Sequence, residues 1–224
     1  MVRKAGSEGR EASRSEVTRE RLLEAGLSLF GKQGFDSVST RSLAEAADAN
    51  QAAIPYHFQS KEGLYHAVAR RVVTLIRADM EPVVEAVLER HRGGVSDLAL
   101  AREDVVTLIL SLLRRILSHS HRCDISAFIV REQMHPTAAM DILYEGLLQP
   151  LHQALATLVG PLRGKAEDDP DIIIEVLALF GEAIVFGVHR TTLRRRLGVT
   201  ELDADHLQRV NEVLRGMVMR QFPL

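Results

Sequence analysis

A short run of residues near the N-terminus has side chains suited to binding double-stranded DNA. Gln51 stands near the start of a predicted helix, and a glutamine amide can form two hydrogen bonds with the edge of one adenine. The alanines after it allow close approach of the backbone and contact with a thymine methyl group. Hydroxyl, imidazole and cationic groups bind phosphate, as do the amides at a helix N-terminus. The candidate DNA contacts are Thr40, Arg41, Gln51, Ala52, Ala53, Tyr56, His57 and Lys61.

Three potential helix caps predict the elements that position these side chains. Ser39 can cap a first helix that contains Leu43, Asn50 a second helix, and Ser60 a third. Asp48 begins the turn between the first two helices. Helices this short do not stand alone, so the pattern indicates a helix-turn-helix whose second helix enters the major groove. The alternative is a helical hairpin packed for stability only, and it leaves the spacing of the caps unexplained.

Motifs with a family-specific spacing run through residues 18–66. They are Thr18-Arg19-Glu20, Leu22-Leu23-Glu24-Ala25-Gly26, Leu29-Phe30, Gly34-Phe35, Leu43-Ala44, Tyr56-His57-Phe58 and Lys61-Glu62-Gly63-Leu64. In these motifs the chain resembles the DNA-binding domain of the tetracycline-repressor (TetR) family. The resemblance implies DNA-contact roles for the eight candidate residues. The later stretches 131–137 (REQMHPT) and 143–146 (LYEG) resemble the CecR-like branch of that family.

The turn and the second helix depart from the family pattern at two positions. The family usually has glycine where this chain has Asp48, and aspartate tolerates a left-handed backbone conformation at some strain. It usually has tyrosine where this chain has Pro55, which removes a backbone N–H and normally breaks a helix. We therefore expect a very short or kinked recognition helix that lacks one hydroxyl contact.

Length and composition are consistent with an all-α protein of two domains. The 224 residues are 46% hydrophobic but only 4% aromatic, without tryptophan, which favours packing of helices on helices. One cysteine and a polar start predict a cytoplasmic protein without a disulfide framework or signal peptide. Net charge is −2, and residues 1–66 contain nine Lys or Arg and nine Asp or Glu, so DNA binding must depend on local charge placement.

The expected domain order is a disordered arm over 1–14, a three-helix DNA-binding domain over 15–62, and a helical ligand-binding and dimerisation domain over 63–224. A long helix from Lys61 joins the domains and ends or kinks at Pro82. Later helices are expected at 83–90, 102–118, 124–133 and 137–159, and at the C-terminus.

The stretch 172–188 (IIIEVLALFGEAIVFGV) is apolar around nearly its whole circumference. It is too short and too often interrupted by glutamate for a typical membrane span, so we expect it to face its own core on one side and a second subunit on the other. Residues 140–159 of both subunits should complete the bundle. The predicted homodimer interface contains Leu147, Leu151, Leu155, Leu177, Phe180, Ala183, Ile184 and Gly187.

A small, mainly apolar effector is expected to bind the second domain. The 102–118 helix exposes only a narrow polar face, and its other face should form one wall of the cavity. A few polar groups from the 124–135 segment would fix the orientation of the effector. The predicted ligand-binding residues are Ile109, Leu113, Ile116, Phe128, Arg131, Glu132, Met134 and His135.

Two classes of function compete for this sequence. The first is a ligand-responsive transcriptional repressor that binds a palindromic operator as a dimer, with no cofactor, metal or membrane partner. The second is a helical metal-dependent enzyme that uses His119, His121, Cys123 and His135. The enzyme hypothesis finds no H-E-x-x-H or paired-carboxylate motif and leaves 39–61 unexplained. We therefore expect a regulator and not an enzyme.

Overall fold

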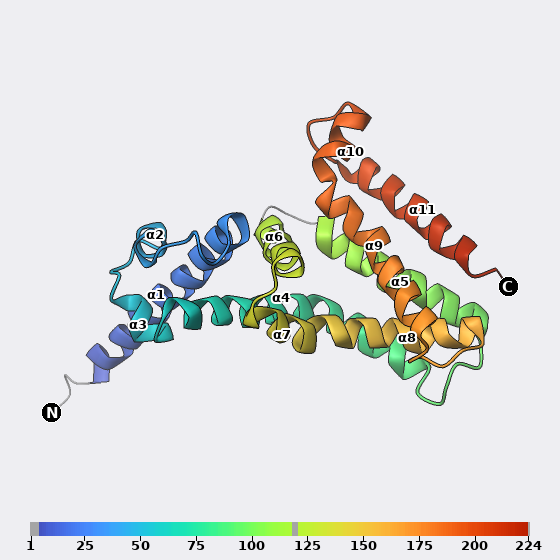
Figure 1. The fold of residues 1–224 in the computed structure, drawn as a ribbon, viewed down its shortest axis with the longest axis horizontal. Coiled ribbons are helices and arrows are strands. Elements are labelled where there is room, and N and C mark those ends of the chain that lie inside the picture. Colours follow the sequence, from blue (N-terminus) through green and yellow to red (C-terminus); the bar gives the residue numbers. More distant parts are fainter. Residues whose placement is uncertain (1–4, 118–120, 224) are drawn as a thin grey trace. The chain divides into compact units, whose positions relative to one another are not determined.

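The computed structural model describes residues 5–117 and 121–223, and it contains only helices as regular structure in these ranges (Figure 1). The predicted all-α fold is confirmed. In chain order the helices are α1 (Ala5–Gln33), α2 (Thr40–Ala46), α3 (Ala53–Phe58), α4 (Lys61–Arg90), α5 (Leu98–Leu117), α6 (His121–Met134), α7 (Ala138–Leu143), the π-helical turn η1 (Tyr144–Leu148), α8 (Gln149–Arg163), α9 (Pro170–Val188), α10 (Arg190–Leu197) and α11 (Ala204–Gln221).

The chain divides into two compact units. The first comprises Met1–Thr74 and Asp124–Leu143, and the second comprises Leu75–Cys123 and Tyr144–Leu224. The sequence placed the boundary near residue 62, whereas the N-terminal part of α4 and the helices α6 and α7 belong with the DNA-binding elements. The reason is burial: the α4 stripe of Leu64, Val68 and Val72 is fully buried, together with Leu22 of α1.

α1 begins at Ala5, so it includes most of the stretch 1–14 for which we predicted a disordered arm. Alanine, glutamate and arginine in this stretch are good helix formers, and the helix continues through them without a break. The helix was expected to start near Glu16. Its apolar side chains farther along, including Leu23 and Phe30, are buried in the first unit.

Serine side chains begin α2 and α4 as predicted. The Ser39 hydroxyl accepts a hydrogen bond from the Ser42 amide at 3.0 Å, and the Ser42 hydroxyl accepts one from the Ser39 amide at 3.1 Å, which forms a capping box. The Ser60 hydroxyl accepts from the Gly63 amide at 2.9 Å. Asn50 accepts from the Ala52 amide at 2.8 Å but precedes a helix that begins only at Ala53, later than expected.

α4 is one continuous helix through Pro82 and includes the segment for which we expected a separate helix. Proline removes one helical N–H, which leaves the carbonyl four residues earlier, that of Ala78, without its helical donor. Both Ala78 and Pro82 are exposed, so water can satisfy this carbonyl. Met80 and Val87 are buried and hold the helix on both sides of the proline.

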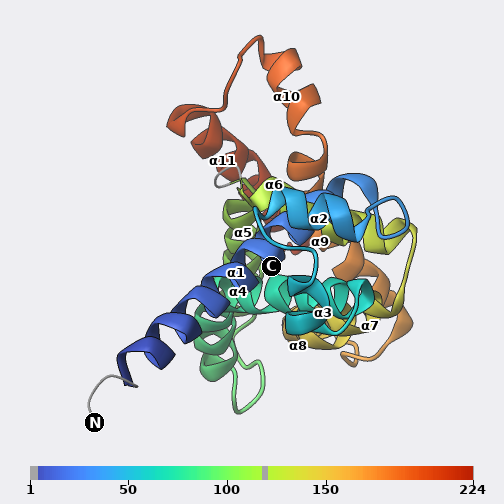
Figure 2. The same cartoon turned by 90° about the vertical axis from the view of Figure 1, so that its left-hand side faces the viewer.

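In the second unit, α5 packs against α8, α9 and α11 (Figure 1, Figure 2). It begins at Leu98, four residues earlier than expected, because Asp97 accepts a hydrogen bond from the Leu100 amide at 3.0 Å. The predicted broad apolar face is present, and its buried apolar residues are Ala101, Val105, Val106, Leu108, Ile109, Leu112, Leu113 and Leu117.

Residues 138–163 are helical in three consecutive pieces. The Thr137 hydroxyl accepts from the Ala139 amide at 3.1 Å and so caps α7, as predicted. The π-helical turn η1 then separates α7 from α8, whose first turn contains Pro150.

Within the described chain, no single helix has the length and hydropathy to cross a membrane. In the same described ranges, only α9 and α10 taken together are long and apolar enough, and the chain bends by 64° between them.

Candidate functional site

The two elements of the helix-turn-helix meet through Gln51 and Thr40. The Gln51 amide nitrogen donates to the Thr40 hydroxyl oxygen at 2.7 Å, and Gln51 is exposed. This bond fixes the orientation of the amide and leaves its carbonyl and its second N–H for a base. A glutamine needs one acceptor and one donor to bind adenine, so the geometry is compatible with the predicted base contact.

The turn at Asp48 has a left-handed backbone conformation, as the departure from glycine suggested. Its φ angle is +46°. Arg21 of α1 donates to the Asp48 carboxylate at 3.1 Å and to its carbonyl oxygen at 3.0 Å. A glycine could not provide the carboxylate contact. The side chain therefore ties the strained turn to α1, which offsets part of the strain.

Pro55 does not break the recognition helix, because α3 begins only two residues before it. The first turn of a helix does not use its N–H groups, so a proline there costs little. The Gln51 carbonyl, which the missing N–H would have reached, accepts from the Ile54 amide at 3.2 Å. α3 is short, as expected, with six residues.

Four further candidates come from α2, α3 and the start of α4. Tyr56 is 77% exposed, and its ring meets that of His57 edge-on at 4.8 Å between centroids. Arg41 donates from Nε to Glu45 at 2.8 Å, which raises the pKa of Arg41 and leaves its terminal nitrogens for a phosphate. Lys61 opens α4, where first-turn amides face outward, and its Nζ lies 4.2 Å from the centroid of the Phe35 ring.

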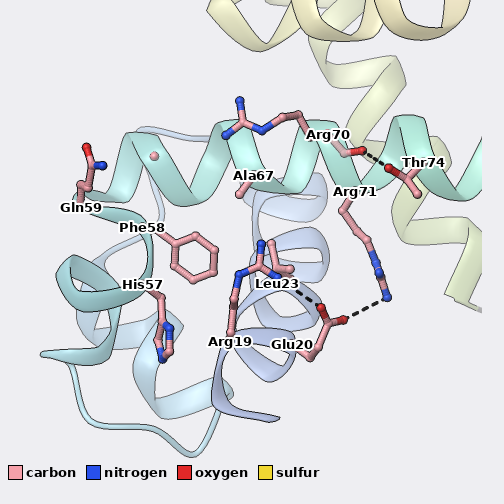
Figure 3. Close-up of a pocket in the computed structure, with 11 residues that line it drawn as sticks. Arg19, Glu20, Leu23, His57, Phe58, Gln59, Ala67, Arg70, Arg71 and Thr74 are labelled. Carbon is pink, nitrogen blue, oxygen red and sulfur yellow. Dashed lines mark hydrogen bonds and ion pairs between the residues drawn. The ribbon is translucent and has the colours of Figure 1, made fainter. Parts of the chain in front are cut away.

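A polar groove of about 500 Å³ runs between α1, α3 and α4 (Figure 3). Arg19, Arg70 and Arg71 line it with Glu20, which pairs with Arg71 at 3.0 Å, so cations outnumber carboxylates there. Gln59 lies at its rim with a φ of +69°, a conformation that non-glycine residues seldom adopt. No local sequence pattern indicates this groove, because its residues come from three separate segments.

A second cavity system lies within the second unit and is mostly apolar. One narrow cavity of about 10 Å³ has the lining Met80, Val84, Leu108, Ile109, Leu112, Leu151, Leu155 and Phe180. A neighbouring one of about 70 Å³ has the lining Arg77, Met80, Glu81, Val84, Gly146, Leu147, Pro150 and Leu151. Three shared residues connect them. The space is about that of a few water molecules, so a drug-sized molecule must push the walls apart.

Two irregular helical segments form the walls where the larger cavity lies. The residues on either side of Pro82 in α4 line one wall, and the π-helical turn η1 lines the other. π-helical turns are rare in proteins, and those that occur are often found at functional sites. Both segments lack part of the regular helical hydrogen bonding.

The predicted ligand-binding residues are split between the two units. Of the α5 candidates, Ile109 lines the cavity, Leu113 is fully buried, and Ile116 lies against Gly187. The α6 candidates belong to the first unit. There Phe128 and Glu132 are fully buried, and Arg131 donates to the carbonyls of Gly31 and Lys32 at the end of α1. Met134 and His135 are exposed.

The predicted dimer residues also separate into two groups. Leu147, Leu155, Phe180 and Ala183 are at most 5% exposed within one chain, and Leu151 lines the cavity. A Cβ atom at Gly187 would lie 2.3 Å from Ile116, so this glycine faces α5. Leu177 and Ile184 are 60% and 38% exposed. These two belong to a continuous apolar face of α9, the α9 face, which consists of Ile173, Ile174, Leu177, Ala178, Gly181, Ile184, Val185 and Val188.

α11 provides further exposed apolar residues in the second unit. Val213 and Met217 are 57% and 36% exposed, and α11 contacts α9. Over the whole of α8, by contrast, no large apolar side chain is exposed. Exposed large apolar side chains of the second unit therefore lie on α9 and α11, with others scattered over α4, α5, η1 and α10. We expected α9 to pair with residues 140–159 of both subunits, and the burial of α8 within one chain depends on contacts that sequence does not reveal.

The described side chains contain no group of three or more potential metal ligands. His119 and the side chains of His121 and Cys123 lie outside the described residues. His135 is exposed at the end of α6.

His152 on α8 predicts a pH dependence of stability. Its ring meets Phe180 edge-on at 4.4 Å, and burial lowers its pKa. The unfolded chain then binds a proton at a higher pH than the folded chain, so the free energy of unfolding falls as pH drops below about 6.5. We expect His152→Gln to remove this part of the decline. Urea unfolding across about pH 5 to 8 measures it, and a constant difference between the two proteins would contradict the prediction.

The comparisons with known proteins agree with this architecture. Residues 22–68 match the model of bacterial regulatory proteins of the tetR family, and residues 101–221 match the C-terminal domain of the HTH-type transcriptional dual regulator CecR. The chain is 31% identical to the CecR regulator of Shigella flexneri over 90% of this chain and 89% of that protein. It is 33% identical to the HTH-type transcriptional repressor NicS of Pseudomonas putida over 97% of this chain and 99% of that protein.

Solved structures share the fold at low sequence identity. The TetR family transcriptional regulator PfmR of Thermus thermophilus has a TM-score of 0.58 at 18% identity, with 91% of this chain and 95% of that chain covered. AibR, in complex with isovaleryl coenzyme A and operator DNA, has a TM-score of 0.61 at 12% identity, with 89% and 97% covered. With a helix-turn-helix at its N-terminus, a CecR-type helical domain after it and relatives that match along at least 90% of its length, this chain is a transcriptional regulator of the TetR family.

Proposed function

We propose that the protein is a repressor that binds a palindromic operator as a homodimer and is released by a small, mainly apolar effector. The observation that carries the DNA-binding part is the Gln51–Thr40 hydrogen bond of 2.7 Å. It holds an exposed amide near the start of α3, where a helix-turn-helix reads bases. The phosphate contacts then come from Thr40, Arg41, Tyr56, His57 and Lys61, and the groove arginines add positive potential beside α3.

Selection of bound fragments from a random DNA library tests this proposal. A palindrome whose half-site centres lie one helical turn apart, about 34–36 Å, or a multiple of it, is the expected result. Recovery of unrelated sequences would contradict specific operator binding. Recovery of single half-sites would contradict the dimer and leave the base contacts in place.

Gln51→Ala is expected to relax discrimination at one base pair of each half-site. The loss at the preferred base should be roughly 1–3 kcal/mol, while binding to random DNA should change little. Band shifts with the selected operator and with single-base variants measure both quantities. Equal losses on operator and random DNA would mean that Gln51 does not read a base.

Lys61→Ala is expected to weaken binding to all DNA sequences alike, because a phosphate contact carries no sequence information. The slope of log affinity against log salt should decrease by about one unit, which corresponds to one phosphate. Titrations at several salt concentrations measure the slope. Arg92→Ala is the matched control, since Arg92 is an exposed cation that pairs with Glu89 in the second unit. A slope that stays unchanged in Lys61→Ala excludes a phosphate contact.

We propose that the homodimer forms through the α9 face together with α11. The α9 face aligns its apolar residues along one side of the helix, opposite the buried Ile172, Val176 and Leu179. Apolar patches of this kind are unusual on a soluble monomer. Gly181 lies within the face and has nothing within 4 Å of a Cβ position, which allows a second helix to approach closely.

We propose that the effector binds in the second unit, in the cavity between α4, α5, α8 and α9. Its lining is apolar except for Arg77 and Glu81 at the larger end, so an apolar body with one polar end suits it. A molecule that opens this cavity must displace the irregular segments at Pro82 and η1. To change the ratio of closed to opened protein from 99:1 to 1:99, the molecule must bind the opened form more tightly by roughly 5.5 kcal/mol.

Linkage provides the test of the effector. A compound that lowers operator affinity must bind operator-bound dimer more weakly by the same factor. Compounds found to release operator in band shifts are titrated by calorimetry into free and operator-bound dimer. Equal affinities in the two titrations would mean that the compound does not act by this coupling.

A further inference from the structure

The side chain of Glu132 is buried in the first unit. Glu132 has no exposed surface, and no Lys or Arg of the described residues forms an ion pair with it. Three donors surround it instead. The Tyr65 hydroxyl donates to Oε1, and Thr137 donates from its amide to Oε2 at 3.1 Å and from its hydroxyl at 3.0 Å. Burial, and then the hydrogen bond to Glu132, raises the pKa of Tyr65.

This arrangement joins α4 to the α6–α7 corner. A buried carboxylate is costly unless donors satisfy it, and removing one donor leaves part of that cost uncompensated. The geometry of Tyr65 is therefore coupled to that of Glu132 and Thr137. An apolar side chain at position 132 could fill the space but could not orient the hydroxyl.

The ring of Tyr65 passes this constraint to the start of α4. It meets the Phe35 ring edge-on, with 5.0 Å between centroids. The Phe35 ring in turn lies beneath the Lys61 ammonium, with 4.2 Å from Nζ to the centroid. A cation is attracted to the face of an aromatic ring within about 6 Å of its centroid, so Phe35 favours one placement of Lys61.

α6 packs closely against the end of α1 within the first unit. A Cβ atom at Gly31 would lie 2.9 Å from the carbonyl oxygen of Asp124 and 3.3 Å from the amide of Phe128, so the two backbones are in close contact. Arg131 donates to the Lys32 carbonyl at 3.1 Å and thereby caps the end of α1. Both ends of the segment from Asp124 to Leu143 continue into the second unit.

We propose that Glu132 is a positioning residue for DNA binding, which acts through Tyr65 and Phe35 to hold Lys61 where it contacts phosphate. The proposal rests on the phosphate role proposed for Lys61. Glu132 touches no DNA itself. A shift of the α6–α7 corner changes the hydrogen bonds of Glu132, and Tyr65 and Phe35 then carry the change to the Lys61 ammonium.

Variants of Glu132 and Tyr65 test this proposal. Tyr65→Phe removes one hydroxyl and keeps the ring, and Glu132→Leu keeps the approximate volume and removes both acceptors. Each should weaken operator binding about two- to fivefold, the range for loss of an exposed cation–π contact, and lower the salt slope. Glu132→Gln should bind close to wild type, because its amide can donate to the Tyr65 oxygen while its carbonyl accepts from Thr137. Tyr144→Phe is the matched control, since Tyr144 is 47% exposed in the second unit.

The decisive measurement repeats these variants in a Lys61→Ala background. If Glu132 acts through Lys61, Tyr65→Phe and Glu132→Leu should cause no further loss there. The same fold loss in both backgrounds, or no loss in either, overturns the proposal while leaving Lys61 as a phosphate contact. If Lys61→Ala alone changes neither affinity nor slope, the phosphate role fails and the positioning role fails with it.

Stoichiometric titration gives the active fraction of each variant, so that partial unfolding is not counted as weak binding. If Glu132→Leu does not fold, Tyr65→Phe alone decides between the outcomes.

Discussion

Leu177→Glu is expected to convert the dimer into monomers and to weaken operator binding by roughly 10²–10⁴-fold, the advantage that linked binding modules provide. Leu177 is 60% exposed at the centre of the α9 face, so a glutamate there is well hydrated in the monomer. In the dimer two carboxylates would be buried against apolar surface and against each other, which is strongly unfavourable. The fold of one chain should remain intact, since Leu177 is not part of its core.

Analytical ultracentrifugation measures the oligomeric state, and band shifts with the full palindrome measure affinity. Leu88→Glu is the control, because Leu88 is an exposed leucine on α4, outside the α9 face. A Leu177→Glu protein that stays dimeric with full operator affinity would rule out the α9 face as the interface. Ala183→Glu and Gly187→Arg are unsuitable tests, because both positions face the interior of their own chain.

Gly63→Ala is expected to displace α3 and to lower operator affinity roughly tenfold or more, the equivalent of 1.4 kcal/mol. A Cβ atom at Gly63 would lie 1.9 Å from the carbonyl oxygen of Phe58, the last residue of α3. That oxygen belongs to the backbone and cannot move away without moving the helix end. Overpacking of this kind costs about 1–3 kcal/mol of stability.

Hydrogen exchange of the α3 and α4 amides locates this disturbance, and urea unfolding gives its size. Gly93→Ala is the matched control, since nothing lies within 4 Å of its Cβ position. It should change stability by no more than about 0.5 kcal/mol and leave DNA binding unaltered. If the two substitutions had the same effect, the contact between Gly63 and Phe58 would not determine the position of α3.

The sequence by itself was sufficient for the helical class, the family and the order of elements in the DNA-binding region. These features depend on local chemistry, which a single segment contains. Ser39 and Ser60 cap helices in any context that allows a helix, and the spacing between the caps limits the lengths of α2 and α3. The positive φ of Asp48 likewise follows from the position of the turn.

The effect of Pro55 on the recognition helix could not be predicted from the local sequence. Its effect depends on where the helix begins, and Asn50 as a cap predicted a start at Gln51, two residues before Ala53. The hydrogen bond that the Ala52 amide donates to the Asn50 side chain forms a turn ahead of the helix. A residue that breaks a helix in its middle is therefore harmless in its first turn.

Only the tertiary structure decided which apolar residues face the core, the cavity or a partner. α9 is apolar on nearly all sides, so its sequence did not distinguish Phe180, which is buried, from Leu177, which is exposed. Glu132 was expected at an effector, and nothing in the sequence indicated its hydrogen bond with Tyr65, 67 positions earlier in the chain. Such contacts join segments that are distant in sequence, and the free energy of burying them exists only when the whole unit packs. Periodicity along one helix contains no information about the partner segment, which is why the sequence determined the elements and the packed chain determined their neighbours.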